Sequence, residues 1–111
     1  MRKGVLNMQY NNIKNIFAPE ITNVDLVEKE IEYISMLIVG VNKKEVIKTL
    51  SFGYSKIRNL YNKLGLTDKT KYRDVQLATL FAMNDVIPKE YLKKLCEKYN
   101  LYQNSDILLE I

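Results

Sequence analysis

Three glycines divide the middle of the chain into short helical segments, and this punctuation limits the fold more than any other feature. Gly40, Gly53 and Gly65 each follow a run in which apolar residues recur at the spacing of an amphipathic helix. Glycine tolerates the positive φ with which helices commonly end. Helices this short are stable only when their apolar faces pack together. The pattern therefore predicts an all-α protein, folded as a compact helical bundle.

The first expected helix begins with Asn23 or Asp25 as its N-cap and closes at Gly40, and Glu28 follows Asp25 as in a capping box. The second helix is expected to begin after Asn42. Its buried face is formed by Val46, Ile47 and Leu50. A tight turn over residues 51–53 follows, in which Gly53 is expected to take a positive φ.

The third expected helix, from about Tyr54 to Leu64, has two different faces. Four apolar residues share one side, namely Ile57, Leu60, Tyr61 and Leu64. This side is expected to face a core. Polar residues occupy the opposite side, namely Ser55, Asn59 and Asn62. Cationic residues flank them, namely Lys56, Arg58 and Lys63. Gly65 is expected to end this helix.

A fourth helix is expected from about Tyr72 to Met83. Its apolar residues lie on more than one side of the helix, namely Val75, Leu77, Ala78, Leu80, Phe81 and Ala82. One face can then pack on the core while another stays available to a partner. Pro88 stands at the expected first position of a fifth helix, which continues to about Tyr99.

The residues that are missing narrow the function. The chain has no histidine and a single cysteine, Cys96, so we expect no metal site, no cofactor and no disulfide. Acid–base catalysis near neutral pH most often uses histidine, so we do not expect an enzyme. No apolar run reaches the length of a membrane span, and no signal-peptide pattern is present. A cytoplasmic location is the expectation.

Positive charge is concentrated in one third of the chain. Between Lys43 and Arg73 lie nine basic and two acidic residues, a net charge of +7, whereas the remainder of the chain carries −3. Such a block is typical of a surface that binds phosphate groups. The alternative is a lysine-rich face that is simply solvated.

A helix, a tight turn and a second helix with a polar and cationic outer face describe a helix-turn-helix DNA-binding unit. Asparagine and arginine suit base edges, because their paired polar atoms match adenine and guanine in the major groove. The residues expected to face bases are Tyr54, Ser55, Lys56, Arg58, Asn59 and Asn62. The alternative is an ordinary helical bundle whose third helix is polar on the outside.

Three stretches resemble the LuxR-type (FixJ/NarL-type) helix-turn-helix DNA-binding domain. Leu26–Gly40 resembles its opening Leu-Thr-x-Arg-Glu-x-Glu-Val-Leu pattern, including the distance to the glycine. Val41–Leu50 is similar to its Ser-Asn-Lys-Glu-Ile-Ala segment, and Asn62–Thr70 to its Lys-Leu-Gly-Val-x-x-Arg-Thr ending. The similarity extends from about Leu26 to Ile87. The family usually has a few more residues between its second and third helices.

The resemblance implies the four-helix core of a bacterial transcription regulator, in which the helix 54–64 enters DNA and the last helix often forms a dimer. The residues expected to bind phosphates are Lys43, Lys44, Lys63, Lys69, Thr70 and Lys71. The residues expected in a homodimer interface are Val75, Leu77, Ala78 and Phe81. Because no receiver or sensing domain precedes the helices, a stand-alone regulator is expected.

The expected elements divide the chain into three parts. Residues 1–22 form a loosely ordered N-terminal arm, in which a strand or helix around Val5–Tyr10 is an option. Residues 23–87 form the helix-turn-helix domain. Residues 88–111 form a C-terminal helical extension packed on the same domain, which blocks DNA binding, supports a dimer, or does both.

The sequence therefore predicts a sequence-specific regulator that binds double-stranded DNA as a homodimer. The alternative is a protein–protein interaction module on a helix-turn-helix scaffold. In that case the fourth and fifth helices bind another regulator or RNA polymerase.

Overall fold

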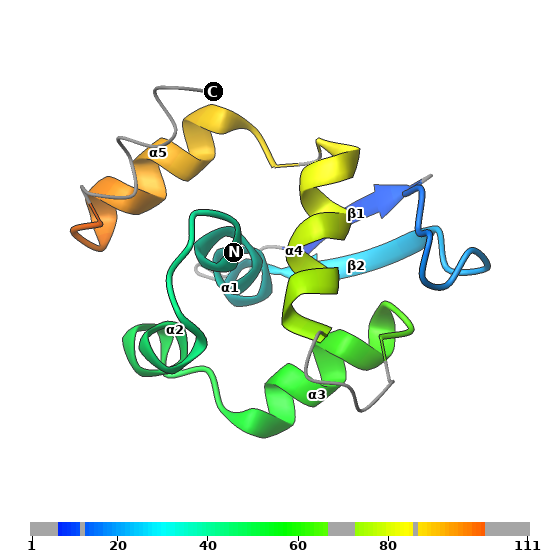
Figure 1. The fold of residues 1–111 in the computed structure, drawn as a ribbon, viewed down its shortest axis with the longest axis horizontal. Coiled ribbons are helices and arrows are strands. Elements are labelled where there is room, and N and C mark those ends of the chain that lie inside the picture. The colour runs from blue at the N-terminus through cyan, green and yellow to red at the C-terminus, as the bar shows by residue number, and fades with distance from the viewer. Residues whose placement is uncertain (1–6, 12, 67–72, 86, 102–111) are drawn as a thin grey trace.

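The computed structural model describes residues 7–11, 13–66, 73–85 and 87–101. This part of the chain folds into five helices and a two-stranded sheet (Figure 1). The elements in chain order are β1 Asn7–Asn11, β2 Asn23–Val27, α1 Glu28–Ile38, α2 Lys43–Leu50, α3 Tyr54–Lys63, α4 Arg73–Asn84 and α5 Lys89–Lys98. The expectation of a compact, mostly helical protein is confirmed. The sheet departs from a strictly all-α fold.

The sheet replaces the expected start of the first helix. β1 and β2 are antiparallel, and Tyr10 is paired with Val24. Val24 and Leu26 are buried while the residues between and beside them are exposed, which is the two-residue period of a half-buried strand. Asp25 consequently lies in β2, and the predicted helix start and capping box at Asp25 and Glu28 are wrong.

α1 begins at Glu28 and is capped differently. The backbone N–H of Val27 donates to Oε1 of Glu30 at 3.0 Å. Most of the helix is buried, including the polar residues Glu30, Glu32 and Ser35. A helix that is buried nearly all round belongs at the centre of a protein. Figure 1 shows α1 nearly end-on at the centre, with the other helices around it.

The segment after β1 packs on the fold, which corrects the expectation of a loosely ordered arm. Asn15 is buried, and its Oδ1 accepts the backbone N–H groups of Phe17 and Ala18 at 3.0 and 2.9 Å. Its Nδ2 donates to the backbone oxygen of Leu64 at 3.1 Å. This segment therefore covers the C-terminal end of α3, and the expected boundary after residue 22 runs through the hairpin.

The expected second helix is confirmed in its start, and of its expected buried face Val46 and Leu50 are buried while Ile47 is half-buried. Oδ1 of Asn42 accepts the backbone N–H of Glu45 at 3.0 Å. The turn that follows differs from the expectation, because Ser51 takes the positive φ of 53° whereas Gly53 has a φ of −70°. Phe52 is buried in this turn and stacks on Tyr33, with ring centroids 5.0 Å apart.

α2 and α3 cross one another in space. Figure 1 shows α2 nearly end-on while α3 lies across the lower part of the view. The turn over residues 51–53 therefore redirects the chain sharply between two short helices. This arrangement presents the length of α3 along one edge of the molecule.

The last two helices pack against α1. α4 buries Leu77, Leu80 and Phe81. α5 follows Pro88, which is the N-cap rather than the first helical residue. Its end is joined to α1, because the buried carboxylate of Glu32 accepts from Nζ of Lys98 at 2.9 Å and from the hydroxyl of Tyr99 at 3.2 Å. This carboxylate raises the pKa of Lys98.

None of the helices in the described part of the chain combines the length and the hydropathy that crossing a bilayer requires. The remainder of the expected C-terminal extension, residues 102–111, lies outside the described residues.

Candidate nucleic-acid interface

The outer side of α3 is open. All six residues that the sequence placed on it are exposed, namely Tyr54, Ser55, Lys56, Arg58, Asn59 and Asn62. Tyr54 is 69% exposed at the start of the helix. The residues expected on the inner side are buried, namely Ile57, Leu60, Tyr61 and Leu64. The two faces of the helix are therefore as the sequence predicts.

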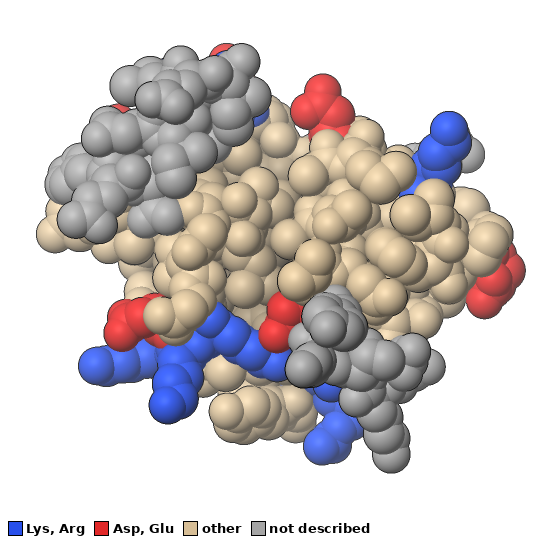
Figure 2. All heavy atoms as spheres, viewed as in Figure 1, with Lys and Arg blue, Asp and Glu red and all other residues tan. Residues whose placement is uncertain are grey.

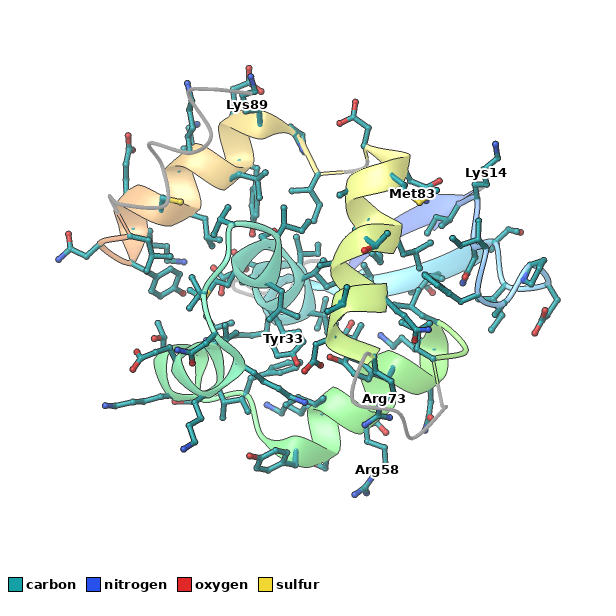
Figure 3. The ribbon with its side chains drawn as sticks, viewed as in Figure 1. Lys14, Tyr33, Arg58, Arg73, Met83 and Lys89 are labelled. Atoms are coloured by element: carbon teal, nitrogen blue, oxygen red, sulfur yellow. The ribbon has the colours of Figure 1, made fainter. Side chains whose placement is uncertain are left out.

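Positive charge accompanies this face. Figure 2 shows lysine and arginine side chains gathered along the edge formed by α2 and α3. In Figure 3, Arg58 points from α3 away from the fold along the same edge. Lys44 and Lys48 on α2 are exposed as well. Within the described ranges no ion pair engages Lys44, Lys48, Lys56 or Arg58, so these cations are free to meet an anion.

The residues expected to bind phosphates divide into three groups. Lys44 is exposed and without an ion pair in the described part of the chain. Lys43 and Lys63 are engaged by carboxylates of the protein itself. Lys69, Thr70 and Lys71 lie outside the described residues.

Lys63 joins the end of α3 to the junction of β2 and α1. Its Nζ lies 2.8 Å from Oε1 of the buried Glu30 and donates to the backbone oxygen of Asp25, also at 2.8 Å. Glu30 is the residue that caps α1 through the N–H of Val27. Lys63 therefore stabilises the fold by linking α3 to β2 and α1. The sequence predicted only a phosphate contact for this residue.

Replacing Lys63 by alanine is expected to lower the free energy of unfolding by about 1–3 kcal/mol, because Glu30 loses its cationic partner while remaining buried. The matched change of Lys56, an exposed cation on the same helix, is expected to stay within about 0.5 kcal/mol. Urea unfolding followed by circular dichroism measures both. Equal small changes for the two variants would show that the ion pair of Lys63 with Glu30 does not contribute to stability.

A polar network lies beneath α3. The hydroxyl of Tyr61 donates to Oδ1 of Asp74, and the hydroxyls of Tyr61 and Tyr33 are 3.1 Å apart. Because the one proton of Tyr61 goes to Asp74, Tyr33 donates to Tyr61. Burial raises the pKa of Tyr33 to about 12. Burial and the bond to Asp74 raise the pKa of Tyr61 further. Both phenols stay protonated at neutral pH.

Cations of two other helices surround Tyr61. The guanidinium of Arg73, the first residue of α4, lies 4.9 Å from the ring centroid of Tyr61, and Nζ of Lys43, the first residue of α2, lies 5.8 Å from it. Nζ of Lys43 is also 3.3 Å from Oδ1 of Asp74. Four helices thus meet at one side chain. The sequence predicts Tyr61 only as a core residue, since no local spacing links it to Asp74.

The expected dimer residues on α4 have different positions. Leu77 and Phe81 are buried in the core of the chain itself, so these two residues are wrong as a surface for a second copy. Val75 is 61% exposed and Ala78 is half-buried. Met83 is also exposed, a residue that the sequence did not single out. Figure 2 shows a broad surface over α4 that carries few charges.

A groove of about 370 Å³ runs between the start of α1 and α3. Val27 and Phe52 contribute apolar surface to it, and Lys56 and Asn59 line it from α3. Among the described residues, no group of three or more carboxylate and thiol side chains is placed to hold a metal ion.

Comparisons of the chain with protein-family models, with characterised proteins and with solved structures find no match. The fold is a compact, mostly helical domain with one polar and cationic helix along its edge.

Proposed function

We propose that this protein is a binding protein rather than an enzyme, a sequence-specific DNA-binding transcription regulator of the helix-turn-helix kind. The observation that carries the proposal is the exposed polar and cationic side of α3. A tight turn over residues 51–53 joins this helix to α2. In this proposal α3 is the recognition helix and enters the major groove. Asn59 and Asn62 are one helical turn apart and suit adenine, while Arg58 suits guanine.

The exposed lysines of α2 supply the contacts to the DNA backbone. Lys44 and Lys48 lie one turn apart on α2, and both are exposed. Contacts to phosphates fix the orientation of a protein on the duplex and dominate its affinity, while base contacts specify the sequence. The proposal therefore assigns affinity to α2 and sequence preference to α3. Lys69, Thr70 and Lys71 are proposed as further phosphate contacts.

The resemblance to the LuxR-type domain agrees with this assignment. In that resemblance the segment 41–50 is the first helix of the helix-turn-helix unit and the helix ending at Gly65 is the recognition helix. α2, Lys43–Leu50, lies within the segment 41–50, and α3 ends at Lys63, two residues before Gly65, which takes a φ of 72°. The short connection over residues 51–53 is compatible with the crossing of the two helices (Figure 1).

The proposal includes a homodimer that forms through the outer side of α4. Uncharged residues with exposed or half-buried side chains share this side, namely Val75, Ala78, Thr79, Ala82 and Met83. A dimer would present two copies of α3 to two half-sites about 34 Å apart. Sedimentation of the free protein and of its DNA complex measures this stoichiometry.

The test is a mobility-shift titration with a random-sequence DNA duplex at low salt. The wild-type protein is expected to retard the duplex, and the shift is expected to weaken as salt is raised, because bound cations release counterions from the DNA. Selection from the same random pool is then expected to enrich a consensus sequence. Asn59→Ala is expected to change that consensus, whereas Lys48→Ala is expected to weaken binding to every duplex alike. Absence of any shift at low salt would refute the proposal.

A protein–protein interaction module is the second candidate. The surface over α4 with few charges favours it, together with a groove of about 180 Å³ between α4 and α5 that Phe81, Ala82 and Leu92 help to line. Such a module would bind another regulator or RNA polymerase through α4 and α5. It predicts no shift of random duplex DNA, so the same titration separates the two candidates.

A further inference from the structure

Two neighbouring lysines at the start of α2 have different surroundings. Nζ of Lys43 is 3.3 Å from Oδ1 of Asp74 and lies over the ring of Tyr61, whereas Lys44 is exposed and has no ion pair within the described ranges. We propose that Asp74 is an internal competitor for DNA phosphate, which holds Lys43 and so weakens sequence-independent binding. This inference rests on the proposed DNA-binding function.

The carboxylate of Asp74 is held in place beside Lys43. Its Oδ1 accepts the hydroxyl proton of Tyr61, whose ring is fully buried and whose oxygen is bonded to Tyr33. Asp74 is also the second residue of α4, where the positive end of the helix dipole favours a carboxylate. The carboxylate is therefore fixed at the edge of the protein rather than free to turn away when DNA approaches.

Lys43 is placed to contact DNA if Asp74 releases it. It is the first residue of α2, and its side chain is 34% exposed. It is followed directly by Lys44, the exposed lysine proposed to contact phosphate. A lysine side chain is long and flexible enough to change partner. The free energy of a partly exposed ion pair is small, and the free energy of a single phosphate contact is of similar order. The ion pair with Asp74 can therefore offset the binding free energy that a phosphate contact by Lys43 would add.

The carboxylate also acts directly. A fixed negative charge near the proposed interface repels the phosphates of any duplex, whatever its sequence. Base contacts by α3 do not depend on it. Lowering the sequence-independent affinity while leaving the base contacts intact raises the ratio of specific to non-specific binding. Asp74 is thus inferred to be a determinant of specificity that contacts no base.

The test measures how the affinity for a labelled random-sequence duplex falls with KCl, by fluorescence anisotropy. A lysine that neutralises a phosphate contributes about 0.9 to the slope of log affinity against log salt. Lys44→Ala is expected to lower the slope by about 0.9, while Lys43→Ala leaves it unchanged. Asp74→Asn is expected to raise the slope by about 0.9 and to tighten binding about eight-fold at 0.1 M salt. Adding Lys43→Ala to Asp74→Asn should remove this rise in slope, because Lys43 supplies the added phosphate contact.

Asp85→Asn is the matched control, because it makes the same charge change at the exposed residue after α4. It is expected to leave the slope unchanged, and an equal rise in both variants would mean that net charge alone acts. An equal loss of slope for Lys43→Ala and Lys44→Ala would show that Lys43 already contacts DNA and would overturn the inference. This comparison keeps Asp74, so it holds even if Asp74→Asn fails to fold. Absence of binding by the wild-type protein would instead refute the proposed function itself.

Discussion

Replacing Gly65 by alanine is expected to lower the free energy of unfolding by about 2–4 kcal/mol. Gly65 has a φ of 72°, a conformation that is unfavourable for residues with a Cβ. A Cβ built on it would also lie 2.6 Å from the Cβ of Ala18 and 2.9 Å from Cδ1 of Ile21. Because Ala18 has no side chain that can turn aside, the backbone of this segment must shift.

Gly53 is the matched control for this change. It has a φ of −70°, and among the described residues no atom beyond its two chain neighbours lies within 4 Å of a Cβ built on it. The loss of a favourable N-cap glycine and the smaller entropy of the unfolded chain oppose one another, so Gly53→Ala should change stability by less than about 1 kcal/mol. Urea or thermal unfolding compares the two variants. Equal stability for both would mean that the segment around Ala18 does not pack on the end of α3.

Reversing two charges on α3, by Lys56→Glu together with Arg58→Glu, is expected to weaken binding to duplex DNA about 100-fold or more at 0.1 M salt. Lys56 and Arg58 are proposed to face bases, but their positive charges also attract the neighbouring phosphates. At this salt concentration each neutralised phosphate contributes about eight-fold to affinity, and the two new carboxylates add repulsion. Both residues are exposed and have no ion pair in the described part of the chain. The free energy of unfolding should therefore change little.

The control makes the same change of net charge elsewhere, by Lys89→Glu together with Lys94→Glu. Both residues lie on α5 and are exposed, and Figure 3 shows Lys89 on the opposite side of the molecule from Arg58. Mobility-shift titrations of the two double variants are compared at one salt concentration. A similar loss in both would mean that overall charge governs binding and that α3 is not the interface.

Features set by neighbouring residues were predictable from the sequence. The N-cap Asn42 and the two faces of α3 depend on spacings of three and four residues, which act within one or two helical turns. The hairpin was not predictable in the same way. The stretch 23–27 has apolar residues that also fit a helical spacing, and its strand form depends on pairing with Asn7–Asn11, far earlier in the chain.

The candidate interface shows the same division. The sequence by itself determined that α3 has a polar and cationic side opposite an apolar side, because helical periodicity fixes which residues share a face. Only the tertiary structure decided which cations of α2 and α3 are free of an ion pair in the described part of the chain. Glu30 and Asp74 come from other helices to engage Lys63 and Lys43, and an ion pair depends on distance in space rather than along the chain.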